Sequence, residues 1–264
     1  MADDPAATTP TRPKALITGA SSGLGVEFAR QLAERGADLV LVARDRAALE
    51  EVAGTLHEAY GAAIEVLPAD LITDAGTDAV ASRLADPDRP VEILVNNAGF
   101  GLALDFATND IVDEERHLDL HVRATMRLTR AALPPMLARG HGRIINVASV
   151  AAFMPRGTYG AVKSWVVSFS RWANAAYGPR GVTVTAVCPG FTHTNFHERL
   201  GLPPGEEGVP PFMWLDAEQV VREGLRDAAA GKAVSIPSWR YKVLIGAVRL
   251  LPASLAARLA KTGR

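Results

Sequence analysis

Short apolar runs alternate with longer stretches of helical periodicity along most of this chain. The apolar runs show no polar alternation and are predicted to be strands at 14–17, 38–43, 64–67, 93–95, 143–148 and 182–187. Stretches with apolar residues three or four positions apart are predicted to be helices at 23–35, 46–60, 73–84, 111–139 and 159–177. Strands of this kind, separated by helices, are buried on both faces, so the pattern predicts an α/β fold with a parallel sheet covered by helices.

Proline and glycine mark the irregular parts of the pattern. Pro134 and Pro135 predict a bend or break near the end of the helix over 111–139. Residues 191–215 are rich in both residue types, which predicts a long loop, and long loops in compact domains are often functional. The elements expected beyond this loop are an N-cap at Asp216, a helix over 217–230, a short strand at 234–236 and a helical tail over 239–260 interrupted by Pro252.

Composition excludes several classes of protein. The 264 residues are 48% hydrophobic and 22% charged, which suits one soluble domain with a sizeable core. The net charge of −1 gives no electrostatic reason for nucleic-acid binding, and no apolar run reaches the roughly 18 residues of a membrane-spanning helix. The single cysteine, Cys188, excludes a disulfide framework and cysteine zinc ribbons.

The N-terminal segment has neither the basic nor the apolar region of a signal peptide. We therefore expect a disordered tail over 1–13, one domain over 14–238 and a helical extension over 239–264. A cytoplasmic protein is the default expectation.

A glycine-rich turn joins the first expected strand to the first expected helix. The segment from Thr18 to Gly25 has the spacing Gly-x3-Gly-x-Gly, which differs from the commonest dinucleotide fingerprint. Unpaired backbone N–H groups and the helix dipole at such a turn favour a pyrophosphate, and glycines let it approach closely. Three glycines alone also fit an ordinary strand–helix turn, but the α/β context favours a cofactor site. The expected cradle consists of Gly19, Ser21, Ser22, Gly23, Leu24 and Gly25.

The ends of the next two strands bear on the choice of cofactor. In this architecture the second strand ends beside the adenosine ribose, where an acidic residue would bind both hydroxyls of NAD. Here the strand ends in Ala43 and Arg44, and a guanidinium suits a 2′-phosphate, which favours NADP(H) over the alternative of a solvated arginine. Asp70 and Leu71, at the end of the third strand, are expected to flank the adenine; a helix-capping aspartate is the alternative.

Tyr159 and Lys163 form a candidate catalytic pair. Their i, i+4 spacing places both on one helix face, about 5–6 Å apart at Cβ. An ammonium near a phenol lowers the phenol pKa from about 10, so the tyrosine can exchange a proton with a carbonyl or alcohol oxygen. Alone, an unrelated exposed pair is the simpler explanation. Ser149 favours catalysis, because it ends the fifth strand at the active-site edge of an α/β sheet and its hydroxyl can polarise the same oxygen.

Together these motifs resemble those of the short-chain dehydrogenase/reductase family. The resemblance runs from about Lys14 to Ile236 and rests on segments that follow one another in the family's order. These segments are the glycine turn, Asn96-Asn-Ala-Gly99, Ser149, Tyr159-x3-Lys163 and Pro189-Gly190. The resemblance implies a single doubly wound Rossmann-type domain with a seven-stranded parallel sheet, a nicotinamide cofactor, and assembly into a homodimer or homotetramer.

The resemblance also assigns residues to parts of the cofactor. It implies that the adenosine side is lined by Asn97, Ala98 and Gly99. It implies that Lys163 also holds the nicotinamide ribose. The segment around the nicotinamide carboxamide corresponds to Pro189, Gly190, Thr192 and Thr194, and the loop 191–215 corresponds to the family's substrate lid.

Two features depart from the family's pattern. His121 stands where the family usually has an asparagine that holds a water in a proton relay behind the lysine. A histidine can bind a water and carry protons itself, so His121 is a candidate catalytic residue; a helix-interior histidine packed for structural reasons is an equal alternative. Ser149 and Tyr159 are also fewer positions apart than is usual, so the loop 150–158 must be tighter.

Apolar residues dominate the segments expected around the substrate. They are Phe100, Phe153, Met154, Phe191, Phe196, Phe212, Met213 and Trp214. Apolar linings bind apolar bodies, so we expect a hydrophobic ketone, aldehyde or alcohol, although loop packing explains several of these residues. His193 and His197 are four positions apart, but no further ligands accompany them and no metal is expected.

The C-terminal segment 228–264 holds seven basic residues and no acidic one. An apolar stripe accompanies this charge, formed by Val243, Leu244, Ala247, Leu250 and Leu251. Peripheral contact of 239–264 with an anionic membrane is one interpretation. Docking on the protein's own domain or on a second subunit is favoured, because apolar stripes at helical spacing more often bury in protein.

Two functional hypotheses follow. The first is an NADP(H)-dependent oxidoreductase that interconverts a hydrophobic ketone or aldehyde and its alcohol, with Tyr159 as general acid/base. The second is a catalytically weak or inactive cofactor-binding protein with a regulatory or scaffold role, motivated by His121 and the shortened loop. The intact set of Ser149, Tyr159 and Lys163 argues for the first.

Overall fold

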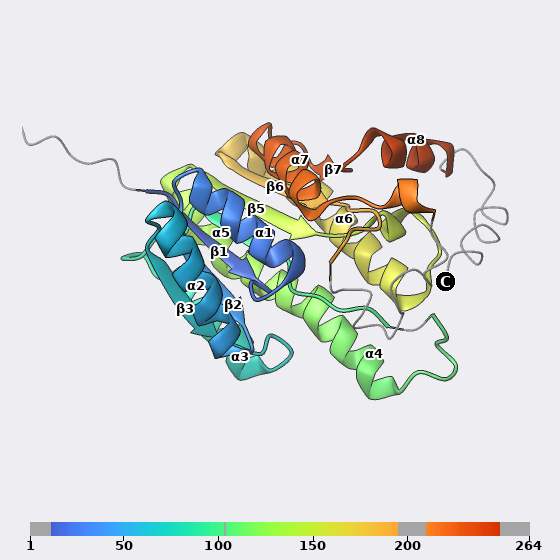
Figure 1. The fold of residues 1–264 in the computed structure, drawn as a ribbon, viewed down its shortest axis with the longest axis horizontal. Coiled ribbons are helices and arrows are strands. Elements are labelled where there is room, and N and C mark those ends of the chain that lie inside the picture. Colours follow the sequence, from blue (N-terminus) through green and yellow to red (C-terminus); the bar gives the residue numbers. More distant parts are fainter. Residues whose placement is uncertain (1–11, 103, 195–209, 249–264) are drawn as a thin grey trace, which may run out of the picture.

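A parallel sheet forms the centre of the molecule. The computed structural model describes residues 12–102, 104–194 and 210–248. Within them, seven parallel strands run in the order β3-β2-β1-β4-β5-β6-β7 (Figure 1). They are β1 (Lys14–Thr18), β2 (Asp38–Ala43), β3 (Ile64–Pro68), β4 (Ile93–Asn96), β5 (Gly142–Val147), β6 (Val182–Val187) and β7 (Val234–Ser235). The chain winds outward from the middle in both directions, so the predicted doubly wound fold is confirmed.

Helices cover both faces of this sheet (Figure 1). One face carries α1 (Gly23–Glu34), α2 (Arg46–Tyr60) and α7 (Ala217–Ala229). The other carries α3 (Asp74–Ala85), α5 (Thr125–Arg139) and α6 (Gly157–Tyr177). The remaining helices are α4 (Ile111–Leu118) and α8 (Trp239–Val248), with short 3₁₀ turns at η2 (Val150–Phe153), η3 (Gly178–Arg180) and η5 (Pro211–Met213).

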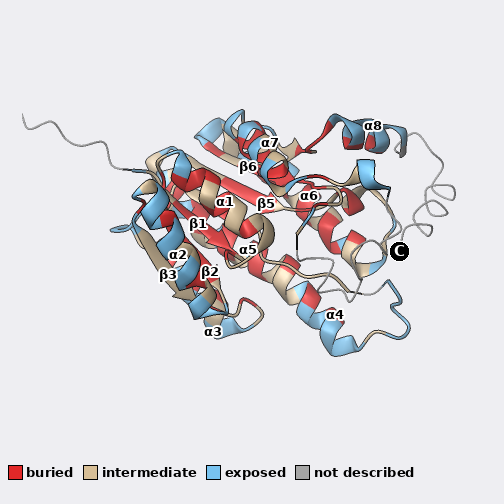
Figure 2. Ribbon diagram, in the orientation of Figure 1, coloured by how far each residue is buried: buried red, intermediate tan, exposed pale blue. Residues whose placement is uncertain are grey.

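The strand β2 shows why its sequence lacks polar alternation. Its residues alternate between two apolar cores, with Leu39 and Leu41 facing the α1–α2–α7 side and Val40 and Val42 facing the α3–α5–α6 side. All four side chains are fully buried. A strand with helices on both faces needs apolar residues at every position, because neither face meets water. Figure 2 shows the resulting band of buried residues through the centre of the sheet.

The helical stretch predicted over 111–139 differs from expectation in where its irregularity lies. Of the predicted bend or break at Pro134 and Pro135, the break does not occur, because the helix α5 continues through both residues. Pro134 is exposed, and Leu133 and Met136 beside it are buried and anchor this turn to the core. The irregular turn is instead the π-helical segment η1 (Asp119–Ala124), which joins α4 to α5.

The C-terminal helix α8 docks on the protein's own domain. Tyr241 and Ile245 are each 1% exposed and pack with Leu215 and Val220, whereas Val243 is 63% exposed. The predicted stripe through Val243 and Leu244 is therefore not the docked face, because the helix is rotated to bury its tyrosine. The parts of the predicted tail beyond this helix, and Phe196 and His197 of the predicted lid, lie outside the described residues.

In the described part of the chain, no helix is both long enough and apolar enough to cross a membrane. Asp216 lies at the N-cap position of α7, as expected, although its side chain makes no capping hydrogen bond.

Candidate active site

The glycine turn after β1 leaves room only for backbone. A Cβ on Gly25 would lie 2.0 Å from the carbonyl oxygen of Gly19, and a Cβ on Gly19 would lie 2.9 Å from Asn97 Nδ2. Gly19 and Gly23 have φ angles of 66° and 56°, which L side chains rarely adopt. The predicted cradle residues Ser21, Ser22 and Leu24 complete the turn and the first turn of α1, which begins at Gly23 with Ser22 as N-cap.

Hydrogen bonds tie the end of β4 to this turn. The backbone N–H groups of Asn97 and Ala98 both donate to Thr18 Oγ1 at 3.0 Å, and Asn97 Nδ2 donates to the Thr18 carbonyl at 2.9 Å. Gly99 follows, and a Cβ there would lie 2.5 Å from His121 Cε1. The predicted segment 97–99 therefore lies where β1 and β4 diverge, which is the ligand crevice of a doubly wound sheet.

Arg44 lies at the carboxyl end of β2 with its side chain exposed. Within the described residues it makes no hydrogen bond or ion pair, so its guanidinium is available to an anion. Asp70 and Leu71 follow β3. The Asp70 carboxylate accepts from the Ile72 backbone N–H at 3.1 Å, and Thr73 rather than Asp70 caps α3. The helix-cap alternative for Asp70 is therefore wrong.

The segment after β6 closes over the glycine turn from the other side. A Cβ on Gly23 would lie 3.4 Å from Thr194 Cβ, so Thr194 lies directly against this turn. Thr192 is 4% exposed, and its hydroxyl donates to the Gly190 carbonyl at 3.0 Å. Pro189 anchors the segment, since its carbonyl accepts from the Val150 N–H at 2.9 Å. The predicted residues 189–194 and the glycine turn are thus neighbours in space.

Tyr241 of α8 holds this segment in place, and sequence reasoning missed it. Its hydroxyl accepts from the Phe191 backbone N–H at 3.0 Å and donates to the Met213 carbonyl at 2.8 Å. A Cβ on Gly190 would lie 2.0 Å from the Tyr241 ring, so the ring occupies the space that the glycine leaves. The only sequence signal was a tyrosine within an expected helix, which does not reveal a partner 50 residues away.

We expect Tyr241→Phe to lower the free energy of unfolding by about 1–3 kcal/mol, because two half-buried backbone groups, at Phe191 and Met213, lose their partner. Urea unfolding measures the change. Tyr177→Phe is the matched control, since the Tyr177 hydroxyl makes no hydrogen bond within the described residues, and it should unfold like the wild type. An unchanged midpoint for Tyr241→Phe would contradict the bracing role.

Ser149, Tyr159 and Lys163 come together at the carboxyl end of β5. Ser149 hydrogen-bonds to Tyr159 and accepts from the Ala151 N–H at 3.1 Å, so the 3₁₀ turn η2 accommodates the short spacing. Lys163 is 4% exposed; its Nζ donates to the Val147 carbonyl at 2.9 Å and lies 5.7 Å from the Tyr159 ring centroid.

Burial dominates the electrostatics of this group. It raises the pKa of Tyr159 above its usual value, although the Ser149 hydrogen bond and the charge of Arg156 act in the opposite direction. The expectation that Lys163 lowers the Tyr159 pKa is therefore wrong for this structure. Burial also lowers the pKa of Lys163 to about 7, so this amine is only partly charged at neutral pH and its field on the phenol is weak.

Two buried histidines lie beside the phenol. His121 is 2% exposed, and its Nε2 lies 2.8 Å from the Phe100 carbonyl oxygen and 3.2 Å from the Phe100 backbone nitrogen. His117 is fully buried, and its ring centroid is 4.4 Å from that of His121 and 5.9 Å from that of Tyr159. Sequence reasoning missed His117, although its i, i+4 spacing from His121 was the available signal.

A polar ladder crosses the sheet behind this group and was also missed. Asn96 Nδ2 of β4 donates to Asn146 Oδ1 of β5 at 2.9 Å, and Asn146 Nδ2 donates to Ser170 Oγ of α6 at 2.9 Å. All three residues are buried. Two asparagines in register on adjacent strands fix the register of the strands whose ends carry 97–99 and Ser149.

Several of the apolar residues expected around the substrate pack within loops instead. Phe153, Phe191 and Met213 pack on the cluster around Tyr241, and Trp214 stacks on His193 with ring centroids 4.7 Å apart. Phe212 is 63% exposed. Within the described residues, no cluster of three metal-ligating side chains occurs.

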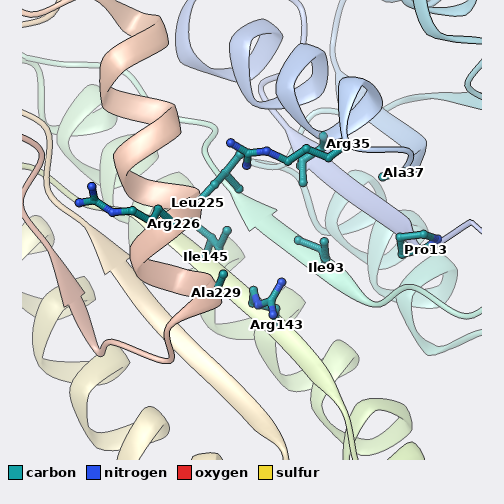
Figure 3. Close-up of a pocket in the computed structure, with 10 residues that line it drawn as sticks. Pro13, Arg35, Ala37, Ile93, Arg143, Ile145, Leu225, Arg226 and Ala229 are labelled. Atoms are coloured by element: carbon teal, nitrogen blue, oxygen red, sulfur yellow. The ribbon is translucent and has the colours of Figure 1, made fainter.

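A separate pocket of about 330 Å³ lies at the opposite end of the sheet from Tyr159 (Figure 3). Pro13, Ile93 and Arg143 line it from the amino ends of β1, β4 and β5. Ligands of doubly wound folds bind at the carboxyl ends, so this pocket is not the candidate active site.

The carboxyl-end crevice fits a dinucleotide. The side-chain-free turn at Gly19 and Gly25 and the N-terminus of α1 form a cradle for a pyrophosphate. The segments 97–99 and 189–194 flank this cradle on either side. Tyr159 and Lys163 lie at the carboxyl end of β5, on the same edge of the sheet as this cradle.

Comparison with known proteins identifies the class of this fold and site. A family model described as short chain dehydrogenase matches residues 13–203. The chain belongs to the short-chain dehydrogenase family.

Individual relatives agree with this assignment. The ketoacyl reductase HetN of Nostoc sp. is 34% identical over 189 residues, covering 70% of this chain and 65% of that protein. A short-chain dehydrogenase from Sphingobium yanoikuyae, solved with NADPH, is 36% identical with a TM-score of 0.82, covering 90% of this chain and 94% of that one. The bulky-bulky ketone specific alcohol dehydrogenase from Comamonas testosteroni is 33% identical with a TM-score of 0.77, and the match covers 90% of this chain and 92% of that one. The chain thus spans just under two thirds of the length of HetN.

Proposed function

We propose that this protein is an NADP(H)-dependent oxidoreductase that interconverts a hydrophobic ketone or aldehyde and its alcohol. The observation that carries the proposal is the meeting of Ser149, Tyr159 and Lys163 at the sheet edge that also bears the glycine cradle. A proton-transfer group beside a dinucleotide crevice is what carbonyl reduction requires.

Different segments of the chain would bind different parts of the cofactor. The turn from Gly19 to Gly25 would hold the pyrophosphate through backbone N–H groups, with 97–99 along the adenosine side and 189–194 around the carboxamide. Asp70 and Leu71 would flank the adenine. Lys163 would hold the nicotinamide ribose. When bound, the cofactor supplies or accepts the hydride at the carbonyl carbon.

Tyr159 would handle the proton. Its raised pKa keeps the phenol protonated at neutral pH, so it is ready to donate to the carbonyl oxygen of a substrate. Ser149, already hydrogen-bonded to the phenol, would hold the same oxygen and orient it. In the reverse direction the phenolate would accept the alcohol proton.

The preference for NADP(H) rests on Arg44. Solved relatives are complexed with NADPH or with NADH, so the family alone does not decide between them. An exposed guanidinium without a partner among the described residues, at the end of β2, suits the 2′-phosphate of NADPH.

An apolar substrate is supported by the residues near the crevice and by the relatives. Phe100 packs edge-on against His117 beside Tyr159, with ring centroids 5.4 Å apart. The Comamonas relative acts on bulky-bulky ketones, as its name states, and HetN is a ketoacyl reductase. We therefore propose ketones with apolar substituents on both sides of the carbonyl.

The test is a substrate panel with NADPH, followed by absorbance at the reduced nicotinamide band. It includes aryl ketones with one and with two bulky substituents, β-ketoacyl thioesters, and a sugar ketone as polar control. We expect oxidation of NADPH with the apolar ketones and little with the sugar. Tight NADPH binding without turnover on any substrate would instead favour the regulatory or scaffold hypothesis.

Assembly into a homodimer or homotetramer also remains a proposal. Leu118 of α4, Met126 of α5 and Trp172 of α6 are 49%, 46% and 57% exposed, and burial of such apolar side chains in a subunit interface would support assembly. Gel filtration with light scattering gives the state directly.

A further inference from the structure

Three titratable side chains lie buried in a row on α4 and η1. Glu114, His117 and His121 are 4%, 0% and 2% exposed, and their spacing places them on successive turns of one helical face. The two imidazole centroids are 4.4 Å apart. Figure 2 shows exposed residues at the outer end of α4 and buried ones where the helix approaches the sheet. The other residues of α4 are exposed, so the row starts on a surface helix and ends beside the phenol of Tyr159.

His117 is the unexplained member of this row. Within the described residues both of its ring nitrogens are buried without a well-aligned hydrogen bond, and a contact with the Phe100 backbone raises the pKa of His117. Burying two unpartnered polar atoms costs stability, and a phenylalanine would fill the space without that cost. Its ring centroid lies 5.9 Å from that of Tyr159 and 4.4 Å from that of His121. Such an imidazole at the active site points to a role in chemistry.

His121 is held in a way that suits either tautomer. Its Nε2 is within hydrogen-bond distance of both the Phe100 carbonyl oxygen, to which it can donate, and the Phe100 N–H, from which it can accept. The ring therefore keeps a backbone partner whichever nitrogen carries the proton. A group that relays protons must change tautomer without losing its position.

Burial, more than the charges around the row, keeps both imidazoles neutral near pH 7. Burial lowers the pKa of His117 to about 4, assisted by the charge of Lys163 and opposed by that of Glu114. Burial also holds the pKa of His121 well below its usual value, with Lys163 and His117 adding to the effect. A neutral imidazole has one donor and one acceptor nitrogen, so it can take a proton on one side and release one on the other.

Glu114 supplies the negative end of the row. Burial raises its pKa, but hydrogen bonds from Asn109, at 2.8 Å, and from Thr158 leave it below the usual value. The carboxylate is therefore ionised at neutral pH. Its charge favours a proton on the neighbouring imidazole of His117 during transfer.

We propose that Glu114, His117 and His121 form a buried proton path to Tyr159, with His117 as the donor next to the phenol. The inference rests on the proposed function. After Tyr159 has given its proton to the substrate oxygen, the phenolate takes a proton from one nitrogen of His117. The other nitrogen regains a proton from solvent by way of Glu114, and His121 shares this proton through its own tautomers. One solvent proton enters for each carbonyl reduced, and no electrons pass along the row.

The test separates the first turnover from later ones. The first turnover uses the proton already on Tyr159, so rapid mixing of His117→Phe with NADPH and ketone should give a first turnover at the wild-type rate. Steady-state kcat should fall roughly 10- to 100-fold, because each later turnover waits for a proton. NADPH affinity should be unchanged. His141→Phe, an exposed histidine outside the row, is the matched control and should behave as wild type.

Chemical rescue provides the second measurement. In His117→Ala, added imidazole should restore steady-state turnover, whereas pyrrole, which has the same ring size but no basic nitrogen, should not. If His117→Phe does not fold, rescue of His117→Ala provides the test. Equal rescue by both rings, or a steady-state kcat of folded His117→Phe within twofold of wild type, would overturn the proton path. A wild type without turnover on any ketone would instead overturn the proposed function.

Discussion

Replacing Tyr159 by phenylalanine is expected to lower kcat by about 10²- to 10⁴-fold, the contribution of a positioned general acid. The ring stays in place against His117 and His121, so the loss comes from the hydroxyl alone. NADPH affinity should change little, because the phenol oxygen binds the substrate oxygen and Ser149 rather than the phosphates. Steady-state kinetics and fluorescence titration of NADPH measure the two quantities separately.

The control for this variant is Tyr177→Phe, at the far end of the same helix α6. It makes the same chemical change without touching the crevice and should keep wild-type kinetics. If Tyr159→Phe retained turnover, the acid/base role of Tyr159 would be abandoned. If it lost NADPH binding as well, the phenol would be part of the cofactor site instead.

Replacing Arg44 by alanine is expected to weaken NADPH by roughly 10- to 150-fold and to leave NADH almost unchanged. A hydrogen bond to a charged group contributes about 1.5–3 kcal/mol, and only NADPH has the phosphate that would receive it. The effect should shrink with added salt, because Arg44 is exposed. Titrations of both cofactors into both proteins give the ratio directly.

Arg46→Ala is the matched control for this change. Arg46 is exposed two residues further on and pairs with Glu50 at 3.4 Å, away from the end of β2. It removes the same charge, so any general electrostatic attraction of the cofactor would fall equally in both variants. Equal weakening of NADPH and NADH by Arg44→Ala would refute the phosphate assignment.

Local patterns predicted the strands, the helices between them and the glycine turn after the first strand. The order of the strands in the sheet came only with the structure. The apolar run of β2 indicated burial on both faces because each face of a parallel sheet is covered by helices. The glycine turn was recognisable for a similar reason, since a strand, a glycine-rich turn and a helix are contiguous in the chain. The meeting of Ser149, Tyr159 and Lys163 could be predicted without knowledge of packing. Ser149 ends a strand at the carboxyl edge of the sheet, and Tyr159 and Lys163 are one helical turn apart.

Other features depended on packing that no local pattern records. The prolines at 134 and 135 predicted a break that α5 does not have, and the π-helical turn at 119–124 carries no proline or glycine at all. Lys163 was expected to act on Tyr159 as a full charge, but burial reverses the direction of the Tyr159 pKa shift and partly neutralises the amine.

The sequence by itself determined the fold class and predicted the glycine turn and the residues available for chemistry, because these depend on periodicity and on short contiguous motifs. Only the tertiary structure decided that His117 meets Tyr159, that Tyr241 braces the segment after β6, and that the stripe on α8 faces outward. The reason is physical: contacts between distant segments, and the desolvation they impose on buried charges, arise from how the elements pack against one another.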